Sequence, residues 1–431
     1  MLDVTKRYRA YVLGSLTVVC ALNYLDRGLM ILLLQPIKED LHLSDTQLGF
    51  LTGIAFGLFY AVLGVPIARW ADRGNRVNIA SLAIALWGLT VMSCVFVVNF
   101  AQLAFARVAA AVGESGCMPP TYSIVGDYFP QPAERTRAMS VYMLASPLAS
   151  LVSFTMGGAL NEAYGWRVTF FLLAIPAVLV ALLLKMTVKE PRALSDPTNV
   201  LNESSRGMLD ILANLWRQHS SRHLCIAIII LFTMGFGLGP WYAAFMIRSH
   251  AMGTAELGMW LGIIFGAGGM AGILFGGYVT VRWFAKDEGG QMRASALMIV
   301  AMVPCFGVFL LAPGKAAALV ALTGLVLVSN FFFAPTFALM QRLVVEESRA
   351  TTLALVMLMA NLLGMGVGPQ IVGVLSDRLA PVLGSDSLRY AMLSMSCVAF
   401  WGAYHFWQVS KTVAADLSDV ACVSAGQART A

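Results

Sequence analysis

The chain alternates between long apolar runs and short polar connections. Twelve runs reach the roughly 20 residues that an α-helix needs to cross a bilayer. They cover residues 10–34, 46–70, 77–98, 100–127, 137–161, 166–186, 222–248, 255–281, 292–312, 316–342, 350–376 and 387–409. The strands of a membrane barrel are shorter, about ten residues of alternating polarity. The pattern therefore predicts an all-α membrane protein with twelve transmembrane helices.

One longer polar stretch divides these runs into six and six. Residues 189–222 contain two prolines, several serines and asparagines, and charges of both signs, a composition typical of linkers. A short amphipathic helix is expected near residues 207–218, and Pro240, which follows three glycines, is expected to break span seven. We predict an N-terminal six-helix bundle over 1–186, a cytoplasmic linker over 187–221, a C-terminal six-helix bundle over 222–410 and a disordered cytoplasmic tail over 411–431.

The two predicted bundles share a sequence pattern. The motif L-G-x-x-x-G-I-x-F-G at residues 48–57 recurs at residues 257–266, an offset of 209 positions. An Arg-Ala pair opens span five at Arg137 and span eleven at Arg349. Parallel repeats of this kind are one of the architectures of membrane transporters. The repeat therefore predicts two pseudo-symmetric halves.

Composition and charge placement support this prediction and set an orientation. The chain is 58% hydrophobic and 12% charged, whereas soluble proteins have about 25% charged residues. The basic residues cluster in alternate connections, which include both termini and the linker. By the positive-inside rule we expect a multi-pass protein of the inner or plasma membrane with both termini cytoplasmic. The net charge of +6 then reflects orientation, so we expect the bilayer as a partner, no nucleic acid, and a monomer.

Four ionisable residues lie inside the predicted spans: Asp26 and Arg27 in span one, and Arg107 and Glu114 in span four. Charges at bilayer depth are costly and usually serve function. Arg107 and Glu114 are seven residues apart, so they share one helix face. Because removal from water disfavours a charged carboxyl, Glu114 is a natural proton carrier. The alternatives are a structural ion pair around Glu114 and, for the first pair, side chains that reach the interface.

The loop between spans two and three reads Ala-Arg-Trp-Ala-Asp-Arg-Gly-Asn-Arg over residues 68–76. It resembles the signature G-x-x-x-D-R-x-G-R-R of the major facilitator superfamily, with Asp72, Arg73 and Arg76 in place and Ala68 at the leading glycine. The resemblance implies a latch between the halves on the cytoplasmic side, with Asp127 as the partner of Arg76. The alternative is that these charges only set orientation.

Three motifs together resemble the Spinster branch of that superfamily: Asn23-Tyr24-Leu25-Asp26-Arg27-Gly28, the Arg107-x6-Glu114 pair, and Pro119-Pro120. The resemblance implies proton-coupled export of lysophospholipids or sphingosine-1-phosphate. Asp26 and Glu114 would carry the proton. Arg27 and Arg107, with Asn23 and Tyr24 beside them, would bind acid partners and an anionic headgroup. Broader relatives move sugar acids and other organic anions.

The second half offers an apolar surface. Spans seven, ten and eleven have no charge in their middles, and their candidates for substrate contact are Trp241, Tyr242, Phe245, Phe332, Phe333, Phe337 and Asn361. A charged wall facing an aromatic wall suits an anionic head with an apolar tail, because burial contributes about 0.8 kcal/mol per CH₂ group. Alternatively, these aromatics face lipid or pack within their own half.

We therefore expect a proton-coupled secondary active transporter of amphipathic anionic lipids that works by alternating access, with the proton as coupling ion and no cofactor. The alternatives are a transporter of small organic anions, sugar acids or drugs and, more remotely, a membrane lipid enzyme or a sensor. The seven cysteines show no metal-binding spacing, so no metal site is expected. No nucleophile motif is recognisable, so we expect no enzyme activity.

Overall fold

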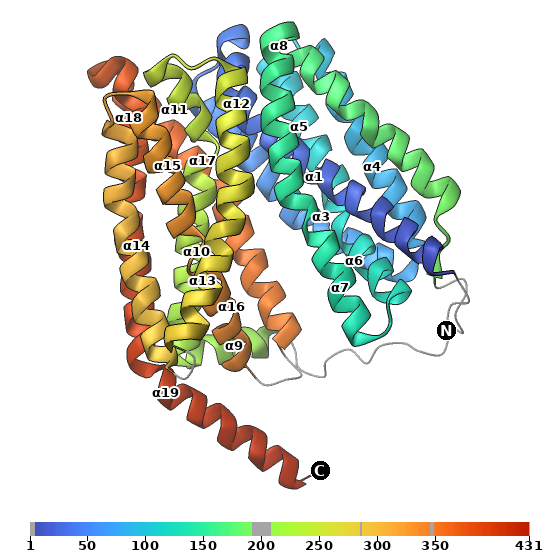
Figure 1. The fold of residues 1–431 in the computed structure, drawn as a ribbon, viewed down its shortest axis with the longest axis vertical. Coiled ribbons are helices and arrows are strands. Elements are labelled where there is room, and N and C mark those ends of the chain that lie inside the picture. Colours follow the sequence, from blue (N-terminus) through green and yellow to red (C-terminus); the bar gives the residue numbers. More distant parts are fainter. Residues whose placement is uncertain (1–4, 192–207, 285–286, 345–348, 431) are drawn as a thin grey trace.

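The computed structural model describes residues 5–191, 208–284, 287–344 and 349–430. The N-terminal half comprises α1 (Lys6–Leu41), α2 (Asp45–Thr52), α3 (Ile54–Arg73), α4 (Arg76–Ser93), η1 (Cys94–Phe96), α5 (Phe100–Ser115), α6 (Met118–Tyr128), α7 (Pro132–Met143) and α8 (Ala145–Thr187). In Figure 1 it forms one of two bundles of long helices.

The C-terminal half forms the second bundle (Figure 1). It comprises α9 (Met208–Arg217), α10 (His219–Leu238), α11 (Trp241–His250), α12 (Thr254–Ile263), the π-helical turn η3 (Ile264–Gly268), α13 (Gly269–Phe284), α14 (Glu288–Leu311), α15 (Lys315–Ser329), α16 (Phe333–Arg342), α17 (Arg349–Leu383), η5 (Gly384–Asp386), α18 (Ser387–Ser396) and α19 (Val398–Thr430). The helix α9 lies where the linker was predicted to contain one.

The twelve predicted spans are present in two six-helix halves. Eight helical stretches in the described part are long and apolar enough to cross a membrane, and two of them, 133–187 and 351–418, each contain two spans. Spans four and ten are built from shorter helices, α5 with α6 and α15 with α16. The predicted fold class is therefore confirmed.

Two residues separate helices, and of these Pro240 was predicted to do so. Gly165 has φ +78°, a left-handed value that favours glycine, and lies inside α8 between the fifth and sixth spans. Pro240 lies between α10 and α11, because its ring cannot continue the hydrogen bonding of a helix. Pro240 divides predicted span seven, whereas Gly165 lies in the connection predicted between spans five and six.

The two halves contact each other on one side of the molecule. The contacting helix pairs are α8 with α12, α17 with α2 and α3, and α1 with α11. The bundles lie close at this side and diverge toward the linker (Figure 1). We call the contacting region, made by residues 45–57, 154–162, 248–262 and 365–377, the closed side.

The repeated glycine motif forms this contact in both halves. A Cβ atom added at Gly53 or Gly57 would lie 2.7 Å from backbone atoms of Gly366 in α17. In the second copy, Gly258 packs against the backbone of Phe154 in α8, where a Cβ would also clash. The motif is therefore repeated because each copy lets its helix approach the opposite half closely.

The prediction of a disordered tail from residue 411 was wrong. Helix α19 continues from span twelve to Thr430. The tail is rich in alanine and contains no proline, so nothing in its sequence stops a helix that has already started.

Candidate functional site

The four predicted charges form two ion pairs that cross between α1 and α5. Arg107 Nη1 lies 2.6 Å from Asp26 Oδ2, and Arg27 Nε lies 3.0 Å from Glu114 Oε2. Each acid therefore pairs with the arginine of the other helix, and Arg107 and Glu114 face α1 together, as their spacing predicted. We call these four residues the crossed quartet.

The quartet is buried unequally. Asp26 and Glu114 are fully buried and Arg107 is 5% exposed, whereas the Arg27 side chain is 23% exposed. One oxygen of each acid, Oδ1 of Asp26 and Oε1 of Glu114, has no hydrogen-bond partner within the described residues. A buried oxygen without a partner is costly, so each acid retains a position for a proton or a further donor.

Aromatic rings surround the guanidinium of Arg27. Its central carbon lies 5.5 Å from the ring centre of Tyr24, 5.1 Å from that of Phe56 and 4.7 Å from that of Tyr60. The ring of Phe56 is also 4.9 Å from the guanidinium carbon of Arg107. Cation–π attraction at such distances stabilises the Arg27 guanidinium in addition to its ion pair with Glu114.

Asn23 and Tyr24, the predicted binding residues beside the charges of span one, make different contacts. Tyr24 faces Arg27, as described above, and Asn23 donates a hydrogen bond from Nδ2 to the backbone oxygen of Glu114 over 3.4 Å. Sequence reasoning missed Phe56 and Tyr60. They lie four residues apart in α3 and so share a helix face, and Phe56 belongs to the repeated motif.

The predicted aromatic wall is divided between core and partly exposed positions. Trp241 and Phe245 are fully buried and Tyr242 is 7% exposed. Phe245 and Tyr242 pack their rings against Phe309. These three residues thus belong to the core of the C-terminal half in this conformation, and the prediction that they line a substrate surface stays untested.

The remaining aromatic candidates form a stack at α16. Phe332 stacks on Phe333 with ring centres 4.8 Å apart, and Phe333 lies 6.1 Å from Phe337. Phe333, Phe337 and Asn361 are half-buried. The residue of the C-terminal half that packs against the ring of Phe56 is Met365 of α17, which sequence reasoning did not single out.

The predicted cytoplasmic latch lies partly within the N-terminal half. Arg76 Nη2 is 2.6 Å from Asp127 Oδ2, as predicted, and 2.6 Å from Glu190 Oε1. Glu190 also accepts hydrogen bonds from the backbone nitrogens of Arg76 and Val77, so it caps α4. These bonds join α4, α6 and the segment after α8. Arg73 is exposed, and the Asp72 side chain lies outside the described set, so a latch between the halves stays a prediction.

The closed side holds an ionic cluster that sequence reasoning missed. Asp45 is 2% exposed and pairs with Arg248 of the opposite half through two contacts of 2.7 and 2.8 Å. Lys38 and Ser376 donate to the same carboxylate over 2.5 and 2.6 Å. Asp45 therefore holds two helices of the C-terminal half, α11 and α17.

Carboxylates also cross between the halves to cap helices. Asp377 of α17 accepts hydrogen bonds from the backbone nitrogens of Asp45 and Thr46, at the start of α2. Glu162 of α8 accepts one from the backbone nitrogen of Ala255, at the start of α12. The helices that lead into the two copies of the motif, α2 and α12, thus each have first-turn backbone N–H groups bonded to an acid of the opposite half. We call these bonds the cross-caps.

The fold and the buried charges define a membrane transporter. The family model described as Major Facilitator Superfamily matches residues 16–369, and the chain belongs to this superfamily. Within the described residues, no group of three His, Cys, Asp or Glu side chains is arranged to hold a metal ion.

Within the superfamily, the chain is Spinster-like. Its structure superposes with a TM-score of 0.85 on a bacterial homologue of the human lysosomal transporter Spinster, solved in an inward-facing, unoccupied conformation. The two are 27% identical, with 96% of this chain and 99% of that chain covered.

Two curated relatives span nearly the whole chain. An MFS-type efflux pump of Mycolicibacterium smegmatis is 31% identical over 95% of this chain and 94% of its own length. The sphingosine-1-phosphate transporter SPNS2 of Danio rerio is 25% identical over 91% of this chain and 82% of its own.

Proposed function

We propose that the protein is a proton-coupled secondary active transporter of amphipathic anionic lipids, such as lysophospholipids or sphingosine-1-phosphate-like molecules. The observation that carries the proposal is the crossed quartet. Two acids that each have one unpartnered oxygen are paired with two arginines. One of these arginines, Arg27, is partly exposed and surrounded by aromatic rings.

The quartet links a proton to an anion through Arg27. While Glu114 is ionised, it occupies the Nε edge of Arg27. A proton on Glu114 removes this negative partner, and Arg27 becomes available to an anionic headgroup. Loss of the proton restores the ion pair and expels the headgroup. Asp26 and Arg107 repeat the arrangement at a deeper and drier position.

Alternating access is proposed to occur by opening of the closed side. With the linker and both termini cytoplasmic, as the basic residues indicate, the closed side faces the cell exterior. The state described here is then inward-facing, like the Spinster homologue that it resembles. The protein would act in the inner or plasma membrane as a monomer, with the proton as coupling ion and no cofactor.

The lipid substrate is supported by aromatic side chains near the charges and by the relationship to a sphingosine-1-phosphate transporter. Tyr24, Phe56 and Tyr60 provide apolar surface beside Arg27. The second candidate function is proton-coupled transport of small organic anions, sugar acids or drugs. A hexuronate transporter of Bacillus subtilis, 23% identical over 88% of this chain and 90% of its own length, favours this alternative.

The test is uptake of a lysophospholipid series into proteoliposomes with and without a proton gradient. We expect Glu114→Gln and Asp26→Asn to reduce gradient-driven uptake at least a hundredfold while the protein still folds. Glu256→Gln is the control, because Glu256 pairs with Lys315 at an exposed position.

Two results would contradict the proposal. Unchanged gradient dependence in both acid variants would remove proton coupling from the quartet. If a sugar acid is taken up and no lysophospholipid is, the proposed substrate changes from a lipid to a small anion, and the proposed coupling through the quartet is unaffected.

A further inference from the structure

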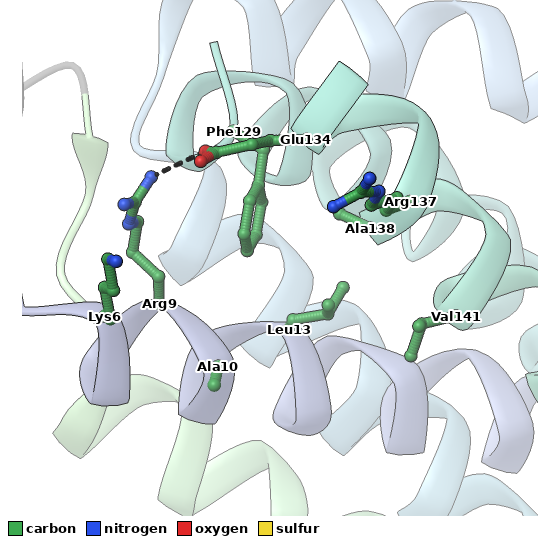
Figure 2. A pocket seen from close by; sticks show the side chains of 9 residues that line it. All are labelled: Lys6, Arg9, Ala10, Leu13, Phe129, Glu134, Arg137, Ala138 and Val141. Carbon is green, nitrogen blue, oxygen red and sulfur yellow. Dashed lines mark hydrogen bonds and ion pairs between the residues drawn. The ribbon is translucent and has the colours of Figure 1, made fainter. Parts of the chain in front are cut away.

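A pocket apart from the quartet lies between the first two turns of α1 and the segment from Phe129 to Val141, which includes most of α7 (Figure 2). It has a volume of about 360 Å³, within the range of about 300–1,000 Å³ that is usual for small-molecule sites. Its lining residues are Lys6, Arg9, Ala10, Leu13, Phe129, Glu134, Arg137, Ala138 and Val141. The transport scheme above uses none of them.

The mouth of the pocket carries an excess of positive charge. Arg9 Nη1 lies 3.1 Å from Glu134 Oε2, and the Arg9 guanidinium lies 5.8 Å from the ring centre of Phe129. Lys6 and Arg137 are exposed, and neither forms an ion pair with any residue that the structure describes. Three cations and one acid thus leave two positive charges without a partner.

Along both helices, charged lining residues are followed by apolar ones. On α1, Lys6 and Arg9 precede Leu13, and on α7, Glu134 and Arg137 precede Val141 (Figure 2). Both helices begin at the linker side and run into the membrane. The pocket is therefore basic at its mouth and apolar about one turn deeper, which matches a phosphate that is joined through glycerol to acyl chains.

We propose that this pocket binds the headgroup of an anionic phospholipid from the leaflet on the linker side. The phosphate would lie between Lys6 and Arg137, and the first carbons of the chains would contact Leu13 and Val141. Basic pockets between transmembrane helices on the cytoplasmic side bind anionic headgroups in this way. The proposal rests on the orientation given under the proposed function and is independent of the substrate.

Binding of phosphatidylglycerol to the full-length protein in detergent, measured by native mass spectrometry, tests the proposal. Phosphatidylcholine and glycerol 3-phosphate serve as the neutral lipid and the free anion. The test variant is Lys6→Gln/Arg137→Gln, with Arg137→Gln alone as a milder form. The matched control is Arg7→Gln/Lys185→Gln, which removes two exposed cations that do not line the pocket.

We expect phosphatidylglycerol to bind at least tenfold more tightly than phosphatidylcholine. The test variant should lose at least tenfold in affinity, Arg137→Gln alone should lose at least threefold, and the control should stay within twofold of the parent. Equal losses of affinity in the test and control variants would show that the effect comes from general surface charge, and this would overturn the proposed site. Equal binding of both lipids, or glycerol 3-phosphate binding as tightly as the lipid, would overturn the anionic-lipid assignment. Since transport of lysophospholipids is not measured, failure here leaves the proposed function intact.

Discussion

Phe56 lies between two arginines that belong to different ion pairs. Its ring centre is 5.1 Å from the guanidinium carbon of Arg27 and 4.9 Å from that of Arg107. It belongs to the same buried cluster as Met365 of the opposite half. One ring thus lies beside both ion pairs of the quartet and at the interface between the halves.

Replacing Phe56 with leucine should weaken anion binding because it removes two cation–π contacts. Each contact is worth about 0.5–1 kcal/mol, so binding should weaken by roughly 5–30-fold. Titration of the purified protein with a lysophospholipid, followed by tryptophan fluorescence, measures the effect. The control is Phe59→Leu, at an exposed position of the same helix. Equal losses in both variants would refute a specific role for this ring.

Glu190 is a second residue whose importance is visible only in three dimensions. It pairs with the buried guanidinium of Arg76 and caps α4. Glu190→Ala should lower the free energy of unfolding on the order of 3 kcal/mol, because it leaves a buried charge with fewer partners. Thermal unfolding in detergent measures the change, with Lys189→Ala at the adjacent exposed position as control. A loss no larger than that of the control would show that Asp127 alone neutralises Arg76.

Sequence identified the members of the quartet and not their pairing. Ionisable residues are rare within apolar spans, so Asp26, Arg27, Arg107 and Glu114 were recognisable by type and position. Which acid meets which arginine depends on the register of α1 against α5, and no periodicity reports this. Phe56 was hidden for a different reason, since aromatic residues are frequent in membrane spans and most of them only pack.

At the scale of the helices, the sequence showed that the glycine motif is repeated, but it did not show what the motif does. Both copies bring a helix start against the opposite half, α2 and α3 against α17 and α12 against α8. The halves are thus joined by two equivalent contacts, related by the same symmetry that relates the two halves.

A methyl group at this contact should force the halves apart. A Cβ at Gly57 would lie 2.7 Å from backbone atoms of Gly366 and Met365, whereas one at Gly64, two turns further along α3, meets nothing within 4 Å. Gly57→Ala should therefore open the closed side, and Gly64→Ala should not. The distance between spin labels at the exposed positions Val98 and Val382, measured by pulsed electron resonance, should lengthen only in the first variant. Identical distance distributions in both variants would show that the contact tolerates a methyl group.

The helix break at Pro240 was predictable because proline imposes it, and the break at Gly165 falls in the connection that was predicted between spans five and six. The π-helical turn at 264–268 was not predictable, because it depends on how α12 and α13 pack. The helical end of the chain was missed because polar composition alone was taken to indicate disorder, although α19 simply continues.

In the whole molecule, the closed side is held by a small number of polar links. Arg248 joins Asp45 across the halves, and the cross-caps satisfy the first turns of α2 and α12. The partners of Asp45 in the opposite half, Arg248 and Ser376, lie more than 200 positions from it in sequence, so neither motif nor spacing could indicate them.

Arg248→Gln should shift the population toward the state that is open on this side. Truncating one partner of a buried, hydrogen-bonded charge pair costs on the order of 2 kcal/mol or more, which corresponds to a change of more than tenfold in the equilibrium. The same spin-label pair should then show a longer distance as the major component. Arg167→Gln is the control, because Arg167 pairs with Asp40 within its own half. If both variants shift equally, the pair with Asp45 is not the element that holds the halves together.

The crossed quartet has a consequence for the energetics of a full cycle. The charges of its two carboxylates and two guanidiniums sum to zero. One proton bound together with one monovalent anion adds no net charge, so the loaded site is neutral as well. Moving one elementary charge through the membrane field changes the free energy by about 2.3 kcal/mol per 100 mV. A neutral load crosses in either direction without this change. Transport of a monovalent lipid should therefore follow the pH difference alone, and clamping the voltage with potassium and valinomycin should leave its rate unchanged. A substrate with two negative charges would meet the same quartet and become sensitive to voltage.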